Sequence, residues 1–214
     1  MKKVFMFLLM LILALNSYSQ SNVTKFLGIP VDGSRAKMEK QLKEKGFKNF
    51  KADKSLFEGE FNGRKVLVGI KTNKEKVCRV TVVDYDYVNV NQIKIRFNTL
   101  YNQFLNNPKY VLVDGKMIDE KEDISYQMTV KHKDYLAGFS QMGTIEEVQN
   151  ILLNKYTEEQ LNNPSKELKK EINNDMIEMI KNNVVWFKIV ESEGEYAIAI
   201  YYDNMYNFPN GEDL

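Results

Sequence analysis

The chain has 214 residues and a formal net charge of +1, and 43% of its residues are hydrophobic. This near-neutral charge gives no electrostatic reason to expect a nucleic-acid partner or an anionic membrane surface. The hydrophobic content is sufficient to fill a core, which excludes a disordered chain and leaves room for one large domain or two small ones.

Residues 1–19 have the pattern of a signal peptide. Lys2 and Lys3 precede an apolar run from Val4 to Leu15, which is shorter than the roughly 20 residues of a membrane-spanning helix. Small residues around Ser19 fit a cleavage site; an uncleaved anchor is the alternative. We expect export to the periplasm or the extracellular space, no stable membrane span after cleavage, and a single α+β domain over residues 20–214.

A helix opens the folded part of the chain. Ser34 is a good N-cap, Met38 and Leu42 lie one turn apart, and Gly46 is a good residue just beyond the C-terminus. The sequence therefore predicts a helix between Ser34 and Gly46.

The stretch from Ser55 to Asp84 carries the strongest local pattern. It alternates with period two, and Asn62-Gly63 is the pair that a type I′ hairpin turn favours. It predicts three consecutive antiparallel strands. We expect the flanking helices to cover the face that carries Val66, Val68 and Ile70.

The middle of the chain predicts a second helix and more strands. Apolar residues recur every three or four positions in residues 92–106, which indicates a helix. Strands are expected at residues 110–113 and 124–130, with a return partner at residues 135–139, because apolar and polar residues alternate there.

The last third predicts two helices and a hairpin. Thr144 and Glu147 fit a capping box, and a longer helix is expected at residues 165–181. Two strands follow, at residues 184–190 and 196–202, joined by a turn at Glu193-Gly194. A weak likeness between the helix starts at Gly33 and Gly143 allows two related helix-plus-sheet halves, at about 26–140 and 141–214.

These helix starts and strand runs resemble the small helix-plus-sheet modules of outer-membrane assembly lipoproteins and of beta-lactamase inhibitory proteins. The mature chain as a whole, from its Phe26-Leu27-Gly28-Ile29-Pro30 start to its Gly211-Glu212-Asp213-Leu214 end, looks like secreted Bacteroidetes-type proteins of unknown function. The chain lacks the lipid-attachment cysteine of the lipoproteins and the disulfides of the inhibitors. The resemblance implies an antiparallel sheet with helices on one face.

The single cysteine and the single histidine limit the possible chemistry. Cys78 has no disulfide partner in the chain, and its place in an alternating strand indicates a small buried hydrophobe. His132 lies between lysines in an expected turn, where a solvent-exposed side chain is the simplest interpretation. No cofactor and no catalytic or metal-binding residues are expected.

Two groups of acidic residues have the composition of possible sites. The oxygen-rich loop from Asp84 to Asn91 offers calcium ligands, but a strand-to-helix connection capped by Asn89 or Asn91 is the better interpretation. Glu58 and Glu60 would be a carboxylate pair for glycosidase chemistry, yet ion pairing across the sheet with lysines explains them better.

Aromatic residues concentrate in the C-terminal hairpin and tail. Most should be core, and the weak candidates for an exposed binding surface are Tyr201, Tyr202 and Tyr206. The function that we expect is a non-enzymatic binding or protein-interaction module of the cell envelope, with another envelope protein or a surface polymer as partner. The alternative is a carboxylate-dependent hydrolase of an envelope or extracellular polymer.

Overall fold

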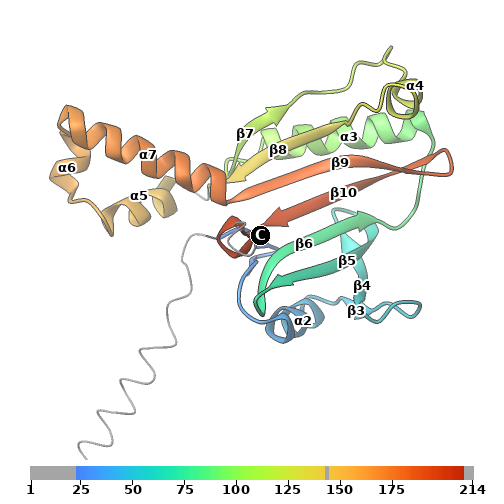
Figure 1. The fold of residues 1–214 in the computed structure, drawn as a ribbon, viewed down its shortest axis with the longest axis horizontal. Coiled ribbons are helices and arrows are strands. Elements are labelled where there is room, and N and C mark those ends of the chain that lie inside the picture. The colour runs from blue at the N-terminus through green and yellow to red at the C-terminus, as the bar shows by residue number, and fades with distance from the viewer. Residues whose placement is uncertain (1–22, 143–144, 210–214) are drawn as a thin grey trace, which may run out of the picture.

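The computed structural model describes residues 23–142 and 145–209. The expected signal peptide and the capping residue Thr144 lie outside these residues. The described chain is an α+β fold built on an eight-stranded antiparallel sheet, with strand order β3-β4-β5-β6-β10-β9-β8-β7 (Figure 1). A separate two-stranded sheet pairs β1 with β2. The expected fold class is confirmed.

The elements follow one another along the chain, with these bounds: β1 Lys25–Phe26, β2 Ile29–Pro30, α2 Arg35–Glu44, β3 Lys48–Asn49, β4 Leu56–Phe61, β5 Arg64–Asn73, β6 Lys76–Asp84, α3 Val90–Leu105, β7 Tyr110–Gly115, α4 Ile124–Thr129, β8 Leu136–Gln141, α5 Ile145–Leu153, α6 Glu158–Asn162, α7 Lys166–Asn182, β9 Val184–Ser192, β10 Glu195–Asp203 and the short 3₁₀ helix η1 Met205–Asn207.

The large sheet consists of two four-stranded meanders. Strands β3 to β6 form one and β7 to β10 form the other, and a helix precedes each, α2 and α3 respectively. The last strands of the two meanders, β6 and β10, pair antiparallel and join them into one sheet. Along the chain, the two meanders are separated by the connection between β6 and α3, at residues 85–89. The two halves considered from the sequence divide near residue 140 instead.

The three strands expected between Ser55 and Asp84 are β4, β5 and β6. Asn62 and Gly63 both have positive φ, 52° and 68°, as a type I′ turn requires. A bulge interrupts the β5–β6 register, because Lys71 pairs with Arg79 while Thr72 pairs with Val77. Cys78 is the extra residue of this bulge, and its side chain is fully buried, as expected.

Helices α2 and α3 cover one face of the sheet. In Figure 1 α3 lies behind β8. Met38 and Leu42 of α2, and Ile93, Phe97, Leu100 and Phe104 of α3, belong to one core cluster with Val66, Val68 and Ile70 of β5. This confirms the predicted covered face, and the other inward residues of the core include Phe57, Val80, Val82, Phe139, Phe187, Ile198 and Ile200.

The strand expected at residues 124–130 is wrong, because Ile124–Thr129 is the helix α4. Asp123 caps this helix by accepting a hydrogen bond from the backbone N–H of Tyr126. The expected partner strand, β8, is paired on both sides, with β7 and with β9, so it has no free edge. Of the alternating apolar residues only Ile124 is fully buried, while Tyr126 and Val130 are exposed.

Helices α5, α6 and α7 form an arm that projects beyond the end of the sheet (Figure 1). The arm is inserted between two neighbouring strands, because β8 and β9 pair antiparallel with Ser140 opposite Val184. Its contact with the rest of the chain includes α7 against β8 and η1. The arm thus takes the place of what could be a short hairpin turn. No helix in the described residues is both long enough and apolar enough to cross a bilayer.

Candidate functional site

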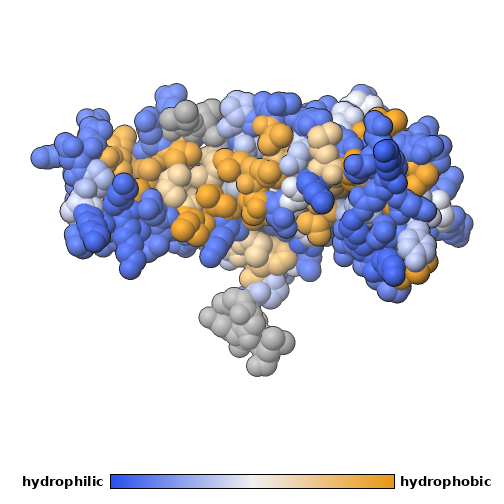
Figure 2. Space-filling model, turned by 90° about the horizontal axis from the view of Figure 1, so that it is seen from above, coloured by the Kyte–Doolittle hydropathy of each residue, from blue (hydrophilic) through white to orange (hydrophobic). Residues whose placement is uncertain are grey.

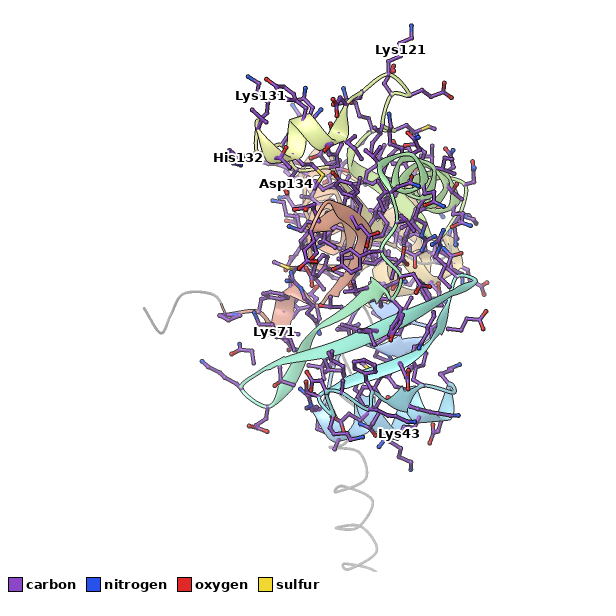
Figure 3. The ribbon with its side chains drawn as sticks, turned by 90° about the vertical axis from the view of Figure 1, so that its right-hand side faces the viewer. Lys43, Lys71, Lys121, Lys131, His132 and Asp134 are labelled. Carbon is purple, nitrogen blue, oxygen red and sulfur yellow. The ribbon has the colours of Figure 1, made fainter. Side chains whose placement is uncertain are left out.

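The second face of the sheet, opposite α2 and α3, carries partly exposed side chains together with three buried positions of β10, namely Ala197, Ala199 and Asp203. We call it the open face. Register places on it the residues that alternate with the core: Leu67 and Lys71 of β5, Arg79, Thr81 and Val83 of β6, Trp186, Lys188 and Val190 of β9, and Ala197, Ala199, Tyr201 and Asp203 of β10. Figure 3 shows Lys71 on the side of the sheet away from α3.

An aromatic pair lies on the open face near one end of β9 and β10: Trp186 is the third residue of β9 and Tyr201 lies two residues before the end of β10. Trp186 of β9 and Tyr201 of β10 are directly opposite in the register. Their rings stack with centroids 4.1 Å apart and an interplanar angle of 17°. Both side chains are partly exposed. Cross-strand aromatic pairs contribute about 0.2–1 kcal/mol to sheet stability, so the pair has a structural role whether or not it binds anything.

Arg79 of β6 lies against this pair and is held by Asp203. The guanidinium carbon is 5.4 Å from the Trp186 ring centroid and 4.9 Å from that of Tyr201. Arg79 donates two hydrogen bonds to the carboxylate of Asp203, at 2.6 Å and 2.7 Å. Trp186 Nε1 donates a third to the same carboxylate, at 2.8 Å. We call these four residues the Arg79 cluster.

The electrostatics of the cluster follow from these contacts. The hydrogen bonds from Arg79 to Asp203 raise the pKa of the arginine, which is charged throughout the accessible pH range. Burial raises the pKa of the Tyr201 phenol, although the nearby Arg79 charge opposes the shift. The tail adds another ring, since Phe208 lies 5.0 Å from the Arg79 guanidinium carbon. At neutral pH the cluster therefore presents two aromatic rings and an arginine whose charge Asp203 balances.

Of the three weak candidates named from sequence, only Tyr201 belongs to the Arg79 cluster. Tyr202 is 3% exposed and packs in the core against Phe26, with ring centroids 5.0 Å apart, so it is not a surface residue. Tyr206 is 42% exposed, but it lies in η1 and lines a separate hollow with helices α5 and α7. The three tyrosines do not form one surface.

Arg79, Asp203 and the part that Trp186 plays are not among the residues predicted from the sequence. Alternation does place Tyr201 and Asp203 on one face of β10, which was a usable signal. What the alternation could not show is that β6 pairs with β10 on the edge opposite the hairpin partner β9. The pairing of β6 with β10 joins residues far apart in the chain, for example Asp203 with Arg79.

The other groups considered from sequence have structural roles. Of the two expected caps, Asn89 and Asn91, the N-cap of α3 is Asn89, which forms a capping box with Gln92. Asp84 is buried and paired with Arg96 of α3, with Nε and Oδ2 3.1 Å apart. Glu58 pairs with Lys65 across the β4–β5 hairpin at 3.3 Å.

His132 is exposed in a turn, with φ 51°, and Figure 3 shows it with Lys131 at the periphery of the molecule. Residues 23–142 and 145–209 bring together no group of three or more histidine, cysteine or acidic side chains that could hold a metal ion. Comparison with family models, with curated proteins and with solved structures finds no match for this chain.

Proposed function

We propose that this chain is an exported, non-enzymatic binding protein of the cell envelope, and that the open face docks a partner protein. Export rests on the signal-like residues 1–19. The observation that carries the docking surface is the Arg79 cluster, in which a tryptophan, a tyrosine and an arginine lie side by side and partly exposed on the open face.

These residue types favour an interface. Tryptophan, tyrosine and arginine supply most of the binding energy in protein interfaces, and they do so near the centre of the contact. Apolar neighbours extend the surface from the cluster toward the β9–β10 turn: Val83 lies opposite Ala199, Leu67 lies opposite Val83, and Val190 lies opposite Ala197. An antiparallel sheet face of this composition fits a protein surface better than it fits a small molecule.

The geometry of the cluster is fixed before any partner arrives. Asp203 is 3% exposed and accepts hydrogen bonds from both Arg79 and Trp186, while Trp186 stacks on Tyr201. Ordering a flexible side chain at an interface costs about 0.5–1.5 kcal/mol, and groups that are already ordered avoid that cost. The cluster is thus a preorganised anchor.

The buried carboxylates favour this proposal over the hydrolase. Asp84 and Asp203 are the buried acidic residues of the described chain, and they lie on opposite faces of the sheet. Each is held in an ion pair, with Arg96 and Arg79 respectively. A pair of carboxylates that shares a glycosidic bond must face one space, about 5–10 Å apart. These two cannot do so.

Quantitative affinity capture from an envelope extract tests the proposal. The purified chain, its Tyr201→Asp variant and its Tyr126→Asp variant serve as baits in parallel. Tyr126 is a matched control, because it is an exposed tyrosine on α4, outside the open face. A partner that docks on the open face should be recovered at least about tenfold less with Tyr201→Asp, as expected for a hot-spot residue, and equally with Tyr126→Asp. Equal recovery with all three baits would place the contact elsewhere.

A further inference from the structure

A second candidate site is a cleft of about 660 Å³ near the end of the sheet. Its lining comes from the N-terminal hairpin of β1 and β2, the segment from Asn107 to Tyr110 that joins α3 to β7, helix α5, and single positions at the ends of β4, β8 and β10. None of the four residues of the Arg79 cluster lines it. Its volume lies within the range of small-molecule sites, about 300–1,000 Å³.

One wall of the cleft is a face of α5. Asn150 and Ile151 of α5 line this wall, and so does Asn154, the residue that follows the helix. The backbone N–H of Asn154 donates to the oxygen of Asn150 at 3.3 Å, so the helical spacing continues and both amide groups lie on the same side. Both residues are exposed, and neither side chain has a hydrogen-bond partner among the described residues. An amide group donates and accepts at once, as a sugar hydroxyl does, so this wall matches a ligand rich in hydroxyl groups.

The base of the cleft holds a fixed phenol. Gln141 Nε2 donates to Tyr110 Oη at 2.9 Å and to the backbone oxygen of Lys25 at 3.0 Å. Tyr110 therefore accepts from Gln141, and its own hydroxyl hydrogen remains available to an oxygen in the cleft. Burial raises the pKa of Tyr110, so the phenol is protonated and able to donate at neutral pH. Apolar surface beside it comes from Phe61 and Met142.

Two cations lie at the rim. Lys25 and Lys109 line the cleft, both are exposed, and neither ammonium group has an ion-pair partner in the described part of the chain. One acidic residue, Glu147, is also among the lining residues, and it already has a partner of its own. The excess of positive charge favours a ligand that carries an anionic group.

The backbone N–H groups of Lys25, Lys109 and Tyr110 at the cleft are already in use, which argues against an extended peptide as the ligand. The N–H of Tyr110 donates to the oxygen of Asn107 and the N–H of Lys109 donates to Asn107 Oδ1. The N–H and the oxygen of Lys25 are both bonded to Gln141. A peptide strand would need free backbone partners, as in strand addition to a sheet edge. Recognition here falls to side chains.

We propose that this cleft is a binding site for a small acidic saccharide. The amides of Asn150 and Asn154 and the phenol of Tyr110 hydrogen-bond its hydroxyl groups, and Lys25 and Lys109 pair with its anionic group. The anion can be a carboxylate or a phosphate, because an ammonium group pairs with either as a point charge. This site lies apart from the Arg79 cluster, so a result that refutes one of the two proposals leaves the other unaffected.

Isothermal titration calorimetry of the purified protein tests the site with digalacturonate, glucose 6-phosphate and lactose as probes. We expect saturable binding of digalacturonate or glucose 6-phosphate, at least about fivefold tighter than lactose and weaker at high salt because the ion pairs are exposed. Preference for one of the two acidic probes identifies the anion. Lactose binding as tightly as both acidic sugars, or no saturable binding of either acidic sugar, would overturn the proposal.

Variants locate the ligand. The double variant Lys25→Ala/Lys109→Ala and the double variant Asn150→Ala/Asn154→Ala should each weaken binding about tenfold, from two exposed ion pairs or two hydrogen bonds. Lys131→Ala/Asn173→Ala is the matched control, since both residues are exposed and lie outside the cleft. Thermal unfolding checks that every variant folds. Undiminished binding by both cleft variants, with the fold intact, would refute the assignment.

Discussion

At the scale of single residues, the buried pair of Asp84 and Arg96 is the most consequential polar contact of the core. Both side chains are 5% exposed, and two hydrogen bonds of 3.1 Å join them. Arg96→Ala leaves a buried carboxylate without its partner, which should lower the free energy of unfolding by about 3–5 kcal/mol. Chemical denaturation measures this loss.

The control for that prediction replaces both partners. Asp84→Leu combined with Arg96→Met removes the charges together and keeps the space filled, so most of the lost stability should return. If Arg96→Ala costs less than about 1 kcal/mol, the pair is solvated and its contribution is that of a surface ion pair.

Cys78 gives a pH-dependent prediction at the same scale. Burial raises the pKa of its thiol above the ordinary value of 9.0. A raised folded-state pKa means that the native state holds its proton more tightly than the unfolded chain. Its contribution to stability is therefore fully present below pH 9.0 and falls as the pH rises further.

The measurement compares native and unfolded labelling. A thiol reagent at pH 8 should modify native Cys78 at least about a hundredfold more slowly than Cys78 in denaturant, because the thiol is buried and the thiolate is the reactive form. Fast labelling of the native protein would contradict the buried environment.

At the scale of elements, the capping box of α3 shows how local sequence decides a helix start. Asn89 Oδ1 accepts from the backbone N–H groups of Asn91 and Gln92, and Gln92 Oε1 accepts from the N–H of Asn89. Asn89→Ala should destabilise the protein by about 0.5–2 kcal/mol. Asn91→Ala, two positions away and exposed, should change stability by only about 0.5 kcal/mol or less. An equal loss in both variants would mean that the cap is not specific.

Local patterns of this kind made part of the fold predictable. The helices α2, α3 and α7 and the hairpins around Gly63 and Gly194 follow from caps, glycines with positive φ and regular periodicity, all of which lie within a few residues. The strand predicted at Ile124–Thr129 was wrong because strand formation depends on residues far away in the chain. Its alternation resembles a strand, but a strand needs a free neighbouring edge, and β8 has none.

The candidate site was less predictable than the fold for the same reason. Tyr201 could be named from composition, but its neighbour Arg79 comes from a strand more than a hundred residues earlier in the chain. Tyr202 was a poor candidate because sequence alone cannot say which face of β10 is covered. The pairing of β6 with β10 brings Arg79 close to Tyr201 and places Tyr202 opposite the core residue Val80.

At the scale of the whole molecule, the arm α5–α7 is an insertion into a hairpin. Gln141 donates its backbone N–H to the oxygen of Asn183, next to the Ser140–Val184 pair. Replacing residues 142–182 with Asn-Gly should therefore close a two-residue turn and leave a chain that unfolds in one cooperative transition. Circular dichroism and the emission of Trp186 monitor it.

The same variant separates the two proposed sites. Removing the arm deletes the α5 wall of the cleft, so acidic sugar binding should be lost, while the open face and its partner binding remain. Loss of the cooperative transition would show that the arm is part of the folding unit.

The most direct test of the docking surface uses Trp186, because it is the single tryptophan of the chain and belongs to the Arg79 cluster. The measurement is acrylamide quenching of its emission, with and without saturating amounts of the partner recovered by affinity capture. If the partner docks on the open face, it covers the indole, and the quenching constant should fall at least about twofold because protein interfaces exclude water around their central residues. A quenching constant that does not change when the partner is bound would contradict the account.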